Sequence, residues 1–163
     1  MITKEQYLNS LKKEFEIIKH LAEKITLPQL DHKPTDGQRT LHELMHYLSY
    51  IFIASTESIV TKDMSSFKKY SEETPLPTLE NFGEMMDKQI SSMTPLINNL
   101  TEEELNEEVN MWSVQTRAMH LLNGPLKWAV AYKMQMFLYL KQSGTANIGT
   151  INLWAGMDTP PKQ

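Results

Sequence analysis

The chain has 163 residues, of which 40% are hydrophobic and 22% charged, and its formal net charge is −4. This size and composition predict one globular domain over residues 1–163. The small negative charge gives no electrostatic reason to expect nucleic acid or an anionic membrane as a partner. Zero cysteines exclude disulfides, thiolate nucleophiles and Cys-based zinc sites. The first residues lack a basic-then-apolar signal sequence, which favours a cytoplasmic protein.

The N-terminal segment predicts a long amphipathic helix. Thr3 is placed to cap it, and Gln6 follows at the spacing of a capping box. Apolar residues then recur at three- and four-residue steps over residues 8–25, which forms one apolar stripe. A turn-rich connector over residues 28–37 leads to a second helix, expected at about residues 38–60.

The middle of the chain predicts one further long helix and several shorter segments. Residues 62–77 are polar, with Phe67 and Tyr70 as their only large anchors, whereas residues 78–97 carry a helical apolar stripe. Pro95 is expected to kink or break that helix, because its ring clashes with the preceding turn. Thr101 begins the capping box of a short acidic helix. Residues 109–122 have no clean period and are interpreted as a structured loop.

The last long helix is expected between Pro125 and Gly144. Proline suits the first helical position, and glycine suits the left-handed residue past the end. Three lysines interrupt the apolar run, so it is too short and too charged to span a membrane. Four long helices with short or medium connections predict an all-α four-helix bundle with short additional helical turns. The stripes predict one shared core, made of Leu8, Leu11, Phe15, Ile18, Leu41, Leu44, Leu48, Phe52, Phe82, Met86 and Ile90.

The last helix also predicts a homodimer, because it has more apolar faces than one bundle core needs. At about 100° per residue, Met134 and Phe137 lie opposite Trp128 and Tyr132. One side can therefore face the core, and the other a partner or the outer helices.

The run His42-Glu43-Leu44-Met45-His46 matches H-E-x-x-H, in which two imidazoles share Zn²⁺ and the glutamate activates its water. The extended motif requires a glycine and a third histidine downstream, and Ser49 and Phe52 occupy those places. We therefore favour the interpretation that both histidines lie on the flank of the apolar stripe and hydrogen-bond to neighbouring groups.

Two stretches resemble the DinB-like family of four-helix-bundle proteins. Residues 40–48 are similar to the family's second helix, and they align its metal-binding histidine with His46. Residues 132–144 resemble the family's last helix, typically H-R-G-Q-L-x-x-Y-L-R-x-x-G. The outright matches there are Gln135, Tyr139, Leu140 and Gly144.

The resemblance implies a three-histidine metal site of which only His46 is retained. Metal-bearing relatives take two further histidines from the last helix, where this chain has Trp128 and Tyr132. An indole cannot ligate a metal, and a phenol with a pKa of about 10 is a poor ligand. We therefore expect no metal or other cofactor, and a small-molecule pocket formed by His46, Trp128, Tyr132 and Gln135. In that pocket His46 could hydrogen-bond to the Tyr132 hydroxyl.

Two alternatives stay open, and with them the question whether the chain is an enzyme. The first is a divalent-metal hydrolase or thiol-dependent transferase, as the resemblance implies for relatives, with zinc or nickel on substitute ligands. Those ligands would be His42, Glu43, His46 and His120. The second is a purely structural dimer, in which the residues of the proposed pocket only fill the core.

Overall fold

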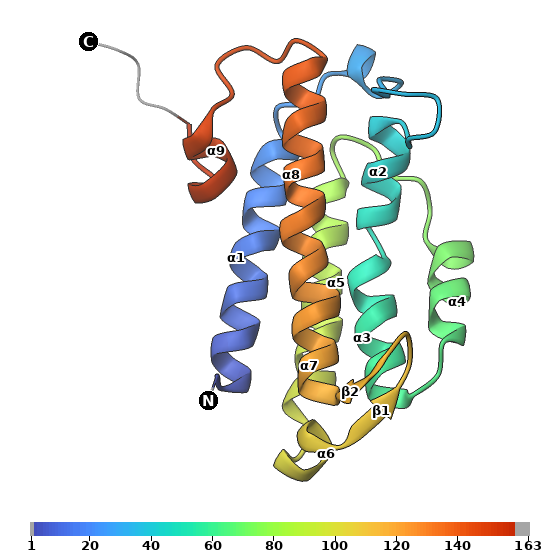
Figure 1. The fold of residues 1–163 in the computed structure, drawn as a ribbon. Coiled ribbons are helices and arrows are strands. Elements are labelled where there is room, and N and C mark those ends of the chain that lie inside the picture. Colours follow the sequence, from blue (N-terminus) through green and yellow to red (C-terminus); the bar gives the residue numbers. More distant parts are fainter. Residues whose placement is uncertain (1, 159–163) are drawn as a thin grey trace.

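The computed structural model describes residues 2–158, most of which are helical (Figure 1). Four long helical segments run side by side. They are α1 (Lys4–Ala22), α2 (Leu41–Leu48) continued by α3 (Ile51–Thr61), α5 (Phe82–Asn98) and α8 (Lys127–Gln142). The all-α fold class is confirmed, and no helix within residues 2–158 is long and apolar enough to cross a membrane.

One hydrophobic core runs between these segments. The predicted core residues are buried in it except Ile90, which is half-buried and packs against its edge. Phe15 of α1 and Phe52 of α3 contact each other there, with ring centroids 4.8 Å apart. Thr3 and Gln6 form the predicted capping box, because each backbone N–H donates to the other side chain, at 2.9 and 3.1 Å.

The second helix is broken at Ser49 and Tyr50, where the sequence predicted a continuous helix. Gln89 of α5 fills the break with its side-chain amide. Its Nε2 donates to the Leu48 carbonyl at 2.8 Å, and the Ile53 N–H donates to its Oε1 at 3.2 Å. The amide thus replaces backbone partners that the break removes.

Residues 62–77, a polar stretch for which the sequence predicted no helix, contain helix α4 (Ser65–Glu73). Glu57 of α3 holds it in place, since its carboxylate accepts hydrogen bonds from Tyr70 at 2.7 Å and Ser66 at 3.0 Å. Burial alone would raise the pKa of Glu57, but hydrogen bonds from Tyr70, Ser66 and Lys69 outweigh it and lower the pKa. The carboxylate therefore stays ionised as the anchor of α4.

Two further segments differ from what the sequence predicted. Helix α5 continues past Pro95 to Asn98, so the predicted break is wrong. Residues 109–122, predicted to be a loop, hold most of an antiparallel hairpin of β1 (Glu108–Asn110) and β2 (Val114–Thr116), and α7 (Arg117–Leu121). A π-helical turn (Leu122–Leu126) then leads into α8. The remaining elements are a 3₁₀ turn (Leu27–Gln29), α6 (Glu102–Asn106) and α9 (Thr150–Ala155).

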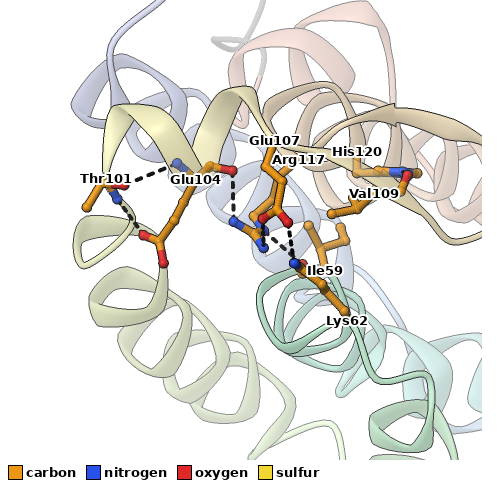
Figure 2. A network of polar contacts seen from close by, with 8 residues as sticks. All are labelled: Ile59, Lys62, Thr101, Glu104, Glu107, Val109, Arg117 and His120. Carbon is orange, nitrogen blue, oxygen red and sulfur yellow. Dashed lines mark hydrogen bonds and ion pairs between the residues drawn. The ribbon is translucent and has the colours of Figure 1, made fainter.

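Arg117 fastens the hairpin and α6 to α3 (Figure 2). Its buried guanidinium donates to the carbonyl oxygens of Ile59 at 3.2 Å and Glu104 at 2.8 Å, and to the Glu107 carboxylate at 2.9 Å. Lys62 pairs with the same carboxylate. This end of the bundle is therefore held together by a fully paired cation.

We predict that Gln89→Met destabilises the protein by about 2–4 kcal/mol, because each buried backbone group left unpaired costs about 1–3 kcal/mol. Urea unfolding followed by circular dichroism measures the change. Gln142→Met, the same substitution at an exposed position of α8, is the control and should change stability little. A loss at Gln89 no larger than at Gln142 would show that the amide does not hold the break.

Candidate functional site

An open pocket of about 610 Å³ lies between α2, the loop that precedes it and α8. Most of its wall comes from residues 37–50, and α8 adds one side chain. The lining residues are Gly37, Gln38, Arg39, Glu43, His46, Tyr47, Tyr50 and Gln135. The pocket therefore joins two stretches that are far apart in the sequence.

Two of the four predicted pocket residues, His46 and Gln135, line this pocket. Tyr132 lies behind the wall, where its ring meets that of Tyr47 nearly edge-on, with centroids 5.2 Å apart. The His46 ring similarly meets Tyr50 at 5.4 Å, and Tyr50 meets Tyr47 at 5.7 Å. A continuous series of ring contacts therefore connects His46 on α2 to Tyr132 on α8.

Trp128, the fourth predicted residue, is absent from the lining of the pocket. Its ring lies 5.5 Å from that of Trp112, in the hairpin, and 6.5 Å from that of Phe67 in α4. Trp128 and Tyr132 are one turn apart on α8, but they belong to different aromatic clusters. The structure thus places Trp128 outside the pocket and in a different aromatic cluster from Tyr132.

The imidazole of His46 is held by the backbone. Its Nε2 lies 2.8 Å from the Thr74 carbonyl oxygen, so this nitrogen carries the proton and donates. It is then not available to the Tyr132 hydroxyl, the partner expected from the sequence. Nδ1 is the remaining nitrogen, and in the neutral ring it accepts hydrogen bonds.

The other residues of the H-E-x-x-H run also have structural roles. His42 Nε2 lies 2.8 Å from the Pro77 carbonyl oxygen, so the two histidines together fasten residues 74–77 to α2. Glu43 belongs to the capping box of α2, and its Oε2 accepts the Thr40 N–H at 2.7 Å. That backbone hydrogen bond is the largest cause of the lowered pKa of Glu43.

His120 lies on α7, next to the hairpin at the end of the bundle away from α2 (Figures 1 and 2). Both of its nitrogens are engaged: Nε2 lies 3.0 Å from the Val109 carbonyl oxygen, and Nδ1 lies 2.9 Å from the Gln115 amide. The structure does not bring it to His42 and His46. In the described part of the chain, no three His, Asp or Glu side chains are grouped to share a metal ion, so the donor set does not fit one.

Sequence reasoning missed five residues that line the pocket, Gly37, Gln38, Arg39, Tyr47 and Tyr50, and the last three bring a charge and two aromatic rings. The Arg39 guanidinium lies 4.2 Å from the centroid of the Tyr47 ring. Burial raises the pKa of both tyrosines, and for Tyr47 a side-chain hydrogen bond with Tyr132 raises the pKa further. The spacing of Tyr47 and Tyr50, one turn apart after a cation, was the available signal. The pocket therefore offers donors, a cation and aromatic faces, which suit a polar ligand.

No sequence-family model matches the chain, and no curated protein matches it either. Among solved structures it is similar to the DinB-like protein YjoA from Bacillus subtilis, with a TM-score of 0.71 and 19% identity over 89% of this chain and 96% of that one. It is also similar to a DinB-like protein from Bacillus cereus, with a TM-score of 0.64 and 14% identity over 90% and 96% of the two chains. The resemblance predicted from the sequence is thus confirmed in three dimensions: the chain has the DinB-like fold.

Proposed function

We propose that the chain binds a small polar molecule in the pocket of Arg39, His46 and Gln135, and that it does so without a metal ion. The observation that carries this proposal is the pocket itself. Its volume of about 610 Å³ falls within the roughly 300–1,000 Å³ of small-molecule sites. Its walls combine a guanidinium, phenol hydroxyls and an amide, which orient a ligand through hydrogen bonds.

The alignment with metal-bearing relatives supports a degraded metal site. It places Trp128 and Tyr132 where those relatives have histidines, and it leaves His46 as the one imidazole. Tight zinc sites have three or four N, S or O ligands. His46 also donates a hydrogen bond from its Nε2 to the Thr74 carbonyl oxygen, so only its Nδ1 is left to ligate a metal ion.

A metal-dependent hydrolase or thiol-dependent transferase with substitute ligands is less well supported. His120 would have to release Val109 and Gln115 and cross from the hairpin end of the bundle. Glu43 would have to give up the cap of α2. We therefore propose a binding protein.

We predict that Gln135→Trp blocks the pocket. A library of small polar molecules should yield ligands that shift the backbone amide signals of Tyr47, Tyr50 and position 135 in heteronuclear NMR spectra. These shifts should disappear in the variant, because the indole fills the space between α2 and α8. Lys127→Trp, at an exposed position at the start of the same helix, is the control and should keep them. Absence of any ligand, or ligands that bind Gln135→Trp unchanged, would refute the pocket.

We predict that the unmodified chain, purified without a metal-affinity tag, holds no stoichiometric transition metal. Combining Trp128→His with Tyr132→His should raise zinc or nickel affinity by orders of magnitude, because His46 then has two imidazole partners. Calorimetric titration measures the gain.

Adding His46→Ala to that double variant should remove most of the gain. Histidines at Lys127 and Ala131, which are exposed on α8 at the same spacing, control for an isolated histidine pair. A folded double variant that binds no better than this control would show that the alignment of α8 is wrong. Stoichiometric metal in the parent would instead favour the substitute-ligand enzyme.

We also propose that the chain forms a homodimer through the outer face of α8. Phe137 is buried, so the face left for a second copy is formed by Val130, Met134 and Leu138, which recur every four residues. Val130 is 39% exposed and Leu138 is 47% exposed. Such a row of apolar residues suits a symmetric contact between two identical helices.

We predict a dimer in sedimentation equilibrium at tens of micromolar, and a monomer for Leu138→Lys, because a buried unpaired charge opposes association. Leu76→Lys changes another exposed leucine, which lies between α4 and α5 and not on α8, and should leave the dimer intact. A monomeric parent would contradict the proposal.

A further inference from the structure

Arg39 is a cation that forms no ion pair within residues 2–158. The chain has two arginines, and the other, Arg117, is buried and fully paired (Figure 2). Within residues 2–158, no carboxylate lies within 4.0 Å of the Arg39 guanidinium. Arg39 lines the pocket instead, where its charge is available to a ligand.

The position of Arg39 is nevertheless fixed. The Tyr139 hydroxyl of α8 donates to the Arg39 carbonyl oxygen at 3.1 Å and accepts from Gln135 Nε2 at 2.9 Å. The guanidinium itself lies over the Tyr47 ring, 4.2 Å from its centroid. A cation–π contact at an exposed site contributes about 0.5–1 kcal/mol. The charge is therefore oriented before a ligand arrives, and less freedom is lost on binding.

The hydrogen-bond donors that the pocket offers to a ligand are side chains, and not the backbone N–H groups at the start of α2. The first N–H groups of α2 are already taken, since Leu41 N donates to the His32 carbonyl at 2.8 Å and His42 N to the Leu30 carbonyl at 3.0 Å. An acidic ligand would accordingly depend on Arg39 for its charge partner. The hydroxyls of Tyr47 and Tyr50 would supply neutral hydrogen bonds.

Glu43 limits how much negative charge the ligand can carry. Its carboxylate lies on the same pocket wall, and the hydrogen bond from Thr40 together with the charges of Lys33 and Arg39 keeps its pKa low. A ligand with two negative charges would therefore face repulsion, whereas one planar carboxylate matches the fork of a single guanidinium.

From these contacts we infer that the ligand is a small organic acid with one carboxylate, which pairs with Arg39. The inference rests on the proposed function, because it assigns a chemical class to the ligand of the same pocket. Arg39 sets the specificity, the tyrosine hydroxyls supply neutral hydrogen bonds, and Glu43 discriminates against more highly charged anions.

The test compares acids with neutral molecules of the same shape: benzoate with benzamide, and 3-phenylpropionate with 3-phenylpropionamide. At low salt, at least one acid should bind tenfold or more tightly than its amide, measured from the amide shifts of residues 37–39 and 135. Arg39→Gln should remove this preference and Arg39→Lys should keep part of it. Lys12→Gln, which removes an exposed charge from α1, should leave the preference unchanged.

The inference would be overturned by equal binding of acid and amide, by a preference that survives Arg39→Gln, or by inorganic phosphate that binds more tightly than either acid. Pocket shifts from the amides alone would refute the acidic class and still support a binding pocket. Absence of shifts from both acids would also refute the acidic class, and the library screen against Gln135→Trp decides independently whether the pocket binds anything.

Discussion

The candidate site depends on the side-chain amide of Gln89, which allows the second helical segment to break. Without a partner for the Leu48 carbonyl and the Ile53 N–H, a buried break would leave two backbone groups unpaired, and the helix would be favoured to continue straight. Since α2 carries His46 and Tyr47, the pocket wall is set by a hydrogen bond from α5, a segment that does not form the wall.

How much of the fold the sequence predicts depends on whether the deciding contact is local. The capping box of Thr3 and Gln6 and the apolar stripes are local, so α1 and the core were predicted correctly. The break is stabilised from 36 residues away by Gln89, and no pattern within the second helix signals it. Helix α4 likewise depends on Glu57 of α3, and its polar composition has no apolar stripe that would predict a helix.

The residues of the candidate site were likewise predicted only where a local stretch of sequence indicates them. His46 and Gln135 were found because each lies in a stretch that resembles the family. Arg39 was missed because a single arginine before a helix has no distinctive pattern, and its role appears only when Tyr139 of α8 holds its backbone. The H-E-x-x-H run is the opposite case: a chemical pattern whose two histidines bind backbone carbonyls and whose glutamate caps a helix.

A metal ion bound between α2 and α8 would also cross-link the two helices, because its ligands come from both of them. In this chain the cross-link is present in another form. Tyr132 of α8 meets Tyr47 of α2 at 5.2 Å, and such aromatic pairs contribute about 0.5–1.5 kcal/mol beyond their burial. Replacing Tyr132 with histidine to rebuild a metal site would remove that contact. Without a bound metal, the Tyr132→His variant should therefore hold α2 and α8 together more weakly. Part of the binding free energy of the metal would then be used to restore the contact between the two helices.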